Sequence, residues 1–245
     1  MKKANPLLVI QSHQPQVPHW IRACTETVED WCRQAGVDRY FLDDEFFDVV
    51  PEDIIEKTLG QPIVATDIAR LIWIKRRLKS YATVVWLDAD FLVFKPDEFR
   101  LPETDFAVGR EVWIQKDKER LRNVTQVHNA FLMFRQGNAF LEFYLDTALR
   151  LVRRNTGSFV PQFAGPKLLT ALHNVAQLPV MECAGMLSPL VAEDIVAGNG
   201  SALRIFLGKS NEVPTGLNLC SSLAASNEFM QRVVDLLLAN GLENR

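Results

Sequence analysis

The sequence predicts a single α/β domain with a mostly parallel central sheet and helices on both faces. Short apolar runs of strand length alternate with longer segments whose apolar residues recur at helical spacing. Such alternation is typical of parallel sheets, because a crossover helix brings the chain back to the edge where the previous strand began. The 245 residues contain no Pro/Gly/Ser-rich linker, internal repeat or low-complexity segment, so we expect one domain.

The N-terminal part of the chain contains the first strand–helix–strand unit. Leu7–Gln11 is an apolar run that predicts the first strand. Trp20–Gln34 has apolar residues at helical spacing, and Gly36 follows it as a helix stop. Arg39–Leu42 predicts a short second strand. Pro51 then begins a short helix, since proline suits the first helical turn.

The next helix and strand lead to a pair of aspartates. Ala65–Ser80 predicts a helix that is opened by Thr66 as its N-cap. Val84–Leu87 is a fully apolar run with two β-branched residues, which is typical of a buried strand. Asp88 and Asp90 follow directly, so we expect both carboxylates where this strand leaves the core.

The remaining elements continue the alternation. The pattern predicts strands at Phe106–Gly109, Ala130–Phe134 and Leu203–Leu207, and helices at Ala139–Arg154 and Asn227–Ala239. Between the first two of these strands, Lys116–Arg122 mixes charges of both signs, so we expect a solvated surface helix or loop there.

Composition excludes several classes of protein. The net charge of −3 gives no reason to expect a nucleic acid or an anionic membrane as partner. No apolar run approaches the roughly 18 residues that span a bilayer. The four cysteines contain no CxxC pair, and we expect reduced, mostly buried thiols in a cytoplasmic protein: Cys24, Cys32, Cys183 and Cys220.

The Asp88-x-Asp90 pair predicts a metal site. Two carboxylates about 4 Å apart repel each other by roughly 4 kcal/mol at an effective dielectric constant near 20. A divalent cation bound by hard oxygen ligands offsets this repulsion, and phosphate oxygens of a substrate complete its coordination shell. We therefore expect Mn²⁺ or Mg²⁺ between Asp88, Asp90 and a diphosphate.

Two further groups of polar residues point to the same crevice. Ligands of such sheets bind outside the carboxyl ends of the strands, where Gln11 and Ser12 follow the first strand. Asp67 and Arg70 share one face of a helix, three residues apart. They form either a plain ion pair or a site in which the carboxylate accepts bonds from sugar or ribose hydroxyls and the arginine braces it or contacts phosphate.

These motifs together resemble the sugar-binding region of glycosyltransferases with a DXD motif, and glycosyltransferase family 32 in particular. The resemblance rests on an Asp-x-x-Arg helix, Ala65–Arg70, followed by a strand that ends in Asp-x-Asp, Trp86–Asp90. Two later segments are also similar to that family. They are an Asn-apolar strand entry, His128–Met133, and a Gly-Pro helix start, Gly165–Thr170.

The resemblance implies a GT-A fold and a metal-dependent hexosyltransferase of polysaccharide biosynthesis that retains anomeric configuration. The donor would be a UDP- or GDP-sugar and the acceptor a saccharide or glycolipid. The resemblance is also compatible with peripheral association of the protein with a membrane. Catalytic roles would fall to Asp88, Asp90 and Asn129, with Asp88 and Asp90 as metal ligands. The donor-binding set would be Ile10, Gln11, Ser12, Asp67, Arg70, Asp88, Gly165 and Pro166. We expect the donor side at about 6–135 and the acceptor side at about 136–245.

Two alternatives stay open. A non-catalytic module could keep the fold and bind a nucleotide-sugar without transferring the sugar. An Asp-nucleophile phosphatase also uses an apolar strand that ends in Asp-x-Asp, in which case Asp88 would be phosphorylated. Metal-dependent hydrolysis of the donor separates the first alternative from a transferase, and covalent labelling of Asp88 would identify the second.

Overall fold

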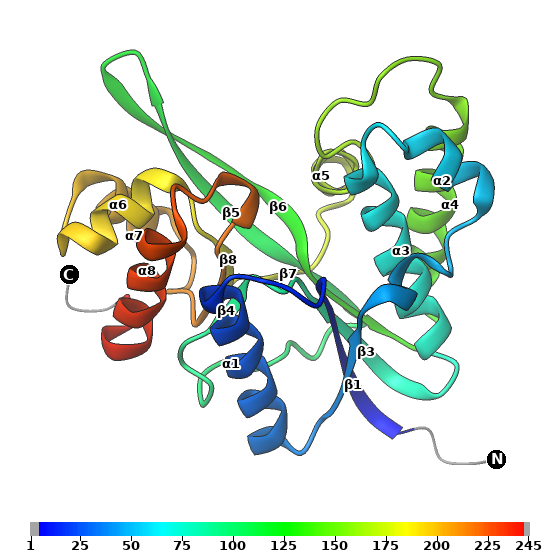
Figure 1. Ribbon diagram of the computed structural model, residues 1–245, viewed down its shortest axis with the longest axis horizontal. Helices are drawn as coiled ribbons and strands as arrows, with labels where there is room; N and C mark the ends of the chain where they lie inside the picture. The colour runs from blue at the N-terminus through cyan, green and yellow to red at the C-terminus, as the bar shows by residue number, and fades with distance from the viewer. Residues whose placement is uncertain (1–4, 243–245) are drawn as a thin grey trace.

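The computed structural model describes residues 5–242 and shows helices on both sides of a twisted sheet, with a long hairpin projecting from it (Figure 1). The elements in chain order are β1 (Asn5–Ser12), α1 (His19–Ala35), β2 (Asp38–Leu42), η1 (Asp44–Phe47), α2 (Glu52–Thr58), α3 (Pro62–Arg77), β3 (Tyr81–Leu87), β4 (Phe91–Val93), β5 (Phe106–Asp117), β6 (Arg120–Arg135), α4 (Ala139–Arg154), α5 (Pro166–Ala176), β7 (Val180–Met181), β8 (Ala184–Met186), α6 (Pro189–Ala197), α7 (Ser201–Lys209), β9 (Gly216–Asn218), η2 (Ser221–Leu223) and α8 (Asn227–Asn240).

The central sheet has six strands in the order β2-β1-β3-β6-β5-β7. The pairs β1–β2, β1–β3 and β5–β7 are parallel, whereas β6 runs antiparallel to both β3 and β5. This arrangement confirms the predicted α/β class with a mostly parallel sheet. A second sheet, β4-β9-β8, has strands of three residues, too short to show a sequence pattern.

Side-chain alternation along the central strands produces a core on each face of the sheet. Leu8, Ile10 and Trp86 point to one face and pack with α3 and α4. Val9 and Val85, one residue away on the same strands, point to the other face and pack with α1. The prediction of helices on both faces is therefore confirmed.

A third group of apolar side chains fills the C-terminal part of the chain. Val112 and Ile114 of β5 pack against α6, α7 and α8. Leu203–Leu207 lies within α7, so the predicted strand is wrong here. Leu203 and Phe206 are three residues apart and both buried, as on one face of a helix; a five-residue apolar run does not distinguish the two structures.

Helix α3 starts three residues earlier than the sequence pattern indicates. Pro62 occupies its first turn, where the missing N–H costs nothing. Thr66 is therefore not the N-cap, and its Oγ1 instead donates to the Pro62 carbonyl at 3.2 Å. The other predicted helix signals hold, because Gly36 ends α1 in the left-handed conformation and α4 spans Ala139–Arg154.

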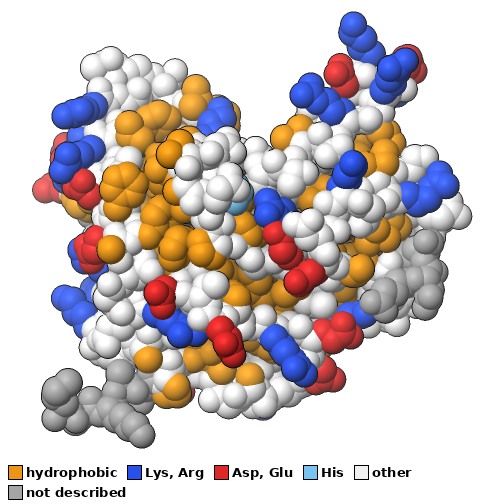
Figure 2. All heavy atoms as spheres, turned by 180° about the vertical axis from the view of Figure 1, so that it is seen from behind, with side chains coloured by type: hydrophobic (Ala, Val, Ile, Leu, Met, Phe, Trp, Pro, Cys, Tyr) orange, Lys and Arg blue, Asp and Glu red, His pale blue; other side chains and the backbone are white. Residues whose placement is uncertain are grey.

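Strands β5 and β6 are much longer than predicted and form the projecting hairpin. Their register pairs residues as far as Asp117 with Arg120. The segment Lys116–Arg122 is therefore the tip of a hairpin and not a surface helix. It is solvated as expected, and charged side chains of both signs cover it (Figure 2). Both faces of the hairpin tip are exposed, so its sequence lacks the alternation of apolar and polar residues that would have predicted a strand.

The four thiols are free and three of them are buried, as the sequence predicted. Within residues 5–242, no helix combines the length and the apolar character needed to cross a membrane.

Gly109 on β5 lies against the imidazole of its cross-strand neighbour His128. The ring is completely buried, its Nδ1 accepts from the Ala130 N–H at 3.2 Å, and its Nε2 donates to the Ala184 carbonyl at 3.1 Å. Burial lowers the pKa of His128 to about 4, so the ring is neutral at pH 7. A Cβ on Gly109 would meet this ring at 2.1 Å.

We therefore expect Gly109→Ala to lower the free energy of unfolding by about 1–3 kcal/mol, the usual cost of overpacking. Gly208→Ala is the matched control, because a Cβ there meets no atom within 4 Å and the position is helical. It should leave stability unchanged or raise it by up to about 1 kcal/mol. Urea unfolding of both variants checks this, and equal effects would contradict it.

Candidate active site

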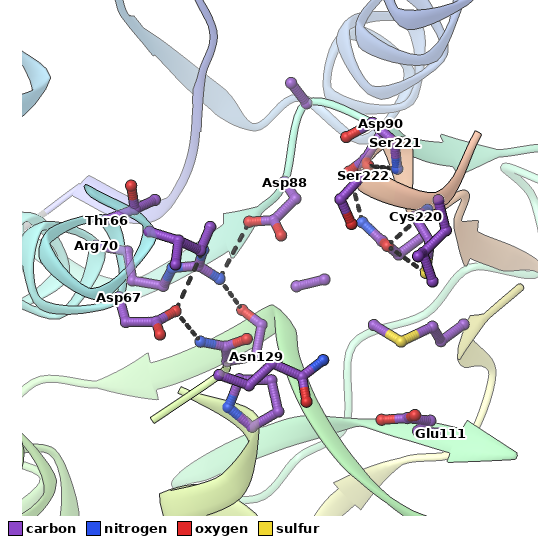
Figure 3. A pocket seen from close by; sticks show the side chains of 18 of the residues that line it. Thr66, Asp67, Arg70, Asp88, Asp90, Glu111, Asn129, Cys220, Ser221 and Ser222 are labelled. Carbon is purple, nitrogen blue, oxygen red and sulfur yellow. Dashed lines mark hydrogen bonds and ion pairs between the residues drawn. The ribbon is translucent and has the colours of Figure 1, made fainter. Parts of the chain in front are cut away.

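A cavity of about 610 Å³ lies beyond the carboxyl ends of β1 and β3, where ligands of open α/β sheets bind (Figure 3). Residues from the end of β1, α3, the turn after β3, strands β5 and β6, the start of α5 and the segment around η2 line it. Polar residues from these elements are Ser12, Thr66, Asp67, Arg70, Asp88, Asp90, Glu111, Gln126, Asn129, Asn218, Ser221 and Ser222.

A buried arginine connects the predicted helix motif to the aspartate pair. Nη1 of Arg70 lies 3.1 Å from Oδ1 of Asp88 and donates to the Asn129 carbonyl at 2.7 Å. Nη2 of the same side chain lies 3.7 Å from Oδ1 of Asp67. Burial opposes the charge, but the Asp88 and Asp67 carboxylates outweigh it and raise the pKa of Arg70. Arg70 therefore contacts Asp88 and Asn129 in addition to its i,i+3 partner Asp67.

Asn129 and Gly165 complete the surroundings of Asp67. Nδ2 of Asn129 donates to Oδ1 of Asp67 at 2.8 Å. The Gly165 backbone also hydrogen-bonds to this carboxylate, and a Cβ on Gly165 would lie 2.5 Å from both of its oxygens. Glycine is therefore required at this position because the start of α5 approaches Asp67 so closely.

Asp67 has one oxygen without a partner. Its side chain is 4% exposed, and Oδ2 accepts no hydrogen bond from the described residues. Burial raises the pKa of Asp67 to about 6, against the lowering effects of Arg70 and Asn129. A buried carboxylate oxygen without a donor is costly, so a polar group of a ligand would be favourable there.

Asp88 is held on one side only. Nε1 of Trp86 donates to Oδ1 of Asp88 at 2.6 Å, the same oxygen that Arg70 contacts. The backbone N–H of Asp88 donates to the Ala130 carbonyl at 2.9 Å, which secures the turn after β3. Both side-chain contacts end on Oδ1, and the side chain is 26% exposed, which leaves Oδ2 available to a ligand in the cavity (Figure 3).

Asp90 is held by the C-terminal part of the chain. Nδ2 of Asn218 donates to Oδ1 of Asp90 at 2.6 Å, and the Ser221 backbone N–H donates to Oδ2 at 2.7 Å. Burial, and after it the Asp88 carboxylate, raises the pKa of Asp90 above its ordinary value. A positive charge between the two aspartates would reverse the second effect.

The structure brings most, but not all, of the predicted site residues together. Ser12 and Pro166 line the cavity with the residues described above, and Gly165 lies directly behind it. Ile10 instead belongs to the core under α3. Gln11 is fully buried and not among the lining residues; it accepts from Nε of Arg39 at 3.1 Å and faces the Asp88 carbonyl at 3.4 Å. Ile10 and Ser12 lie on the same face of β1, but the Ile10 side chain is two residues inside the strand and covered by the core, whereas Ser12 at the strand end reaches the cavity.

Two groups of lining residues lie outside the predicted set of site residues. Asn218 and Ser221 come from a segment with no motif, and only folding places them beside Asp90. Glu111 and Trp113 lie on the unpredicted extension of β5, where polar and aromatic residues at every second position line the cavity. That period-2 pattern was a usable signal, since Glu111, Trp113 and Gln115 alternate with apolar Val112 and Ile114.

No family model and no curated protein sequence matches this chain significantly. Solved structures do match its fold. A glycosyltransferase involved in the glycosylation of the major capsid of PBCV-1 superimposes with a TM-score of 0.50 at 12% identity, over 94% of this chain and 99% of that one. The bifunctional glycosyltransferase WbbM gives a TM-score of 0.50 at 12% identity, over 98% of this chain and 50% of that one.

These structural neighbours are GT-A glycosyltransferases, so the predicted fold class is confirmed. At this level of identity the likeness establishes the fold, whereas the reaction depends on the residues of the site.

The raised pKa of Asp67 predicts a pH-dependent stability. Its folded-state pKa of about 6 exceeds the ordinary 3.8, so its contribution to stability is fully present below about pH 4. That contribution is lost as the pH rises through 6, by about 3 kcal/mol in total at 1.36 kcal/mol per pKa unit.

Asp67→Asn removes this titration while keeping the side-chain shape. We expect the unfolding free energy of the wild type minus that of Asp67→Asn to fall between pH 4 and pH 7, as measured by urea unfolding. Other titrating groups cancel in this difference. A constant or rising difference would show that Asp67 is not buried as described.

Proposed function

We propose that this protein is a metal-dependent glycosyltransferase, similar to those of family 32, that transfers a hexose from a nucleotide-sugar to a saccharide or glycolipid with retention of configuration. The observation that carries the proposal is the position of Asp88 and Asp90. Both carboxylates line a cavity at a strand end, and each is oriented by its own set of donors, from Arg70 and Trp86 on one side and Asn218 and Ser221 on the other.

The residues present fit a divalent cation. Mg²⁺ and Mn²⁺ prefer hard oxygen ligands, and Mg²⁺ is usually bound by one or two carboxylates together with substrate phosphates. Oδ2 of Asp88 has no partner among the described side chains, and each oxygen of Asp90 accepts one bond and keeps a further lone pair. Among residues 5–242 no three acidic, His or Cys side chains cluster closely enough to hold a metal by themselves, so the diphosphate would supply further ligands.

When bound, the cation would neutralise the charge that develops on the departing diphosphate. In the transfer, the bond from the anomeric carbon to the diphosphate oxygen breaks and a bond to the acceptor oxygen forms, and the acceptor's hydroxyl proton passes to the departing diphosphate. The chain's own contribution is to position the donor and exclude water. Asp88 and Asp90 would hold the cation at the diphosphate end of the donor, and Arg70 keeps Asp88 in place.

The buried wall formed by Asp67 and Asn129 suits the sugar of the donor. Oδ2 of Asp67 can accept a hydrogen bond from a sugar hydroxyl. The Gly165-Pro166 turn closes the wall behind Asp67, so the hexose would meet a fixed set of acceptors. Ser12, at the end of β1, is placed to contact the nucleoside. Ile10 and Gln11 would then contribute only through their backbone or by supporting neighbouring residues.

A thermal-shift screen tests the donor site. We would measure the melting temperature with UDP-, GDP-, ADP- and CMP-sugars, each with Mn²⁺ and with EDTA. A ligand that binds only the folded state adds about 2.7 kcal/mol of stability at one hundred times its Kd. We expect one nucleotide class to raise the melting temperature only with Mn²⁺. Binding without hydrolysis or transfer would favour a binding module, and phosphoryl transfer to Asp88 a phosphatase.

Asp90→Asn should abolish the Mn²⁺-dependent shift, because a neutral amide is a weak ligand for a hard cation, while the fold is retained. The matched control is Asp97→Asn, an exposed aspartate after β4 that does not line the cavity. It should behave as the wild type. If Asp90→Asn binds the donor with Mn²⁺ as tightly as the wild type, the metal role of Asp90 is wrong.

A further inference from the structure

One wall of the cavity has no role in donor binding. It consists of the β5 side chains Glu111, Trp113 and Gln115, with Gln126 opposite Glu111 on β6. The intervening residues Val112 and Ile114 are 1% exposed and anchor the strand in the C-terminal core. The wall is therefore a rigid surface, because strand alternation fixes which side chains face the cavity.

Glu111 is the unexplained residue of this wall. Its side chain is buried, with 5% of the residue exposed, and its Oε2 has no hydrogen-bond partner in the described part of the chain. Among the described side chains, only that of Gln126 hydrogen-bonds to the carboxylate. Burial raises its pKa. A buried carboxylate without a cation partner destabilises the folded protein. A contribution to stability therefore does not explain why a glutamate occupies this position.

Glu111 is also distinct from the aspartate pair. Glu111 lies on β5, whereas Asp88 and Asp90 lie in the turn after β3, and within residues 5–242 no three acidic, His or Cys side chains form a cluster that could hold a metal ion. In the close-up view Glu111 lies apart from Asp88 and Asp90, on a different strand (Figure 3). It therefore faces whatever enters the cavity beside the donor.

The chemistry of this wall matches a carbohydrate. A carboxylate oxygen and two amide side chains can accept from and donate to several hydroxyl groups. Trp113 is only partly buried and lines the cavity, so its ring offers an apolar surface for the C–H face of a sugar ring. A phosphate or a second nucleotide would be repelled by Glu111, as no lysine or arginine of the described residues forms an ion pair with it.

We propose that Glu111 and Trp113 form the acceptor subsite, in which a neutral saccharide packs on the Trp113 ring and donates a hydroxyl hydrogen bond to Oε2 of Glu111. This inference rests on the proposed transferase function. It places the acceptor on the β5–β6 hairpin, within the N-terminal 135 residues, and not on the C-terminal part that the sequence alone indicated for the acceptor side.

The test separates acceptor binding from donor binding. Glu111→Gln and Trp113→Ala would be compared with the wild type for three properties: the Mn²⁺-dependent shift with the donor identified by the screen, the slow hydrolysis of that donor by water, and its transfer to p-nitrophenyl glycosides of glucose, galactose and mannose. Glu119→Gln is the matched control, because it removes the same charge from the exposed tip of the same hairpin.

We expect both site variants to keep the donor shift and donor hydrolysis within about twofold. Their KM for the glycoside that the wild type uses should rise about tenfold or more. In Glu111→Gln this is the usual effect of losing a hydrogen bond to a charged group, and in Trp113→Ala the apolar surface under the sugar ring is lost. Glu119→Gln should match the wild type. The proposal is overturned if the acceptor KM of both site variants is unchanged, or if both lose donor binding, which would place Glu111 in the donor site.

Saturation-transfer NMR of the same glycosides, without any donor, distinguishes failure of the subsite from failure of the proposed function. Binding to the wild type that is lost in Glu111→Gln and Trp113→Ala supports the saccharide subsite even if no nucleotide-sugar binds. A wild type that binds and hydrolyses a donor, but neither binds nor uses any of the glycosides, overturns the neutral-saccharide subsite while the donor site stands.

Discussion

The buried Arg70 guanidinium is the interaction on which the rest of the site depends. Asp67 and Asp88 come from a helix and from a strand end, and both would be unpaired negative charges without it. Arg70 also binds the Asn129 carbonyl, so three separate elements are held at one point. Removing one partner of such a buried group typically costs 3–5 kcal/mol, because the remaining charges stay desolvated. The geometry of the donor wall and of the aspartate pair is therefore a single unit.

The second constraint is the return of the C-terminal segment to the aspartate pair. Asn218 is the last residue of the short strand β9, which pairs with β4 directly after Asp90. This pairing brings the Asn218 amide and the Ser221 N–H onto Asp90. The apolar contacts between β5, α6, α7 and α8 hold this segment in place from behind. The short second sheet therefore connects the C-terminal core to the residues that orient the Asp90 carboxylate.

Sequence patterns could predict elements whose side chains have one strong periodicity. Helix α4 and the apolar strands β1 and β3 are of this kind, and their ends were predicted to within a few residues. The Asp67, Arg70, Asp88 and Asn129 group could be predicted because its members follow recognisable motifs. The β5–β6 hairpin and helix α7 could not, since an exposed hairpin tip has no apolar alternation and a short apolar run suits a strand or a helix equally. The side chain of Ile10 lies in the core because Ile10 stands two residues before the end of β1, and a motif does not state where along a strand the core ends.

By itself, the sequence determined the α/β class, the strand that ends in Asp88-x-Asp90 and the helix with Asp67 and Arg70, because these depend on local periodicity and on residue chemistry at fixed spacing. The tertiary structure alone decided that Asn218 and Ser221 hold Asp90, and that Oδ2 of Asp67 and Oε2 of Glu111 are buried without a hydrogen-bond partner among the described residues. These features arise from contacts between segments far apart in the chain. Burial and the absence of a partner depend on the complete three-dimensional surroundings of an atom, which no local pattern contains.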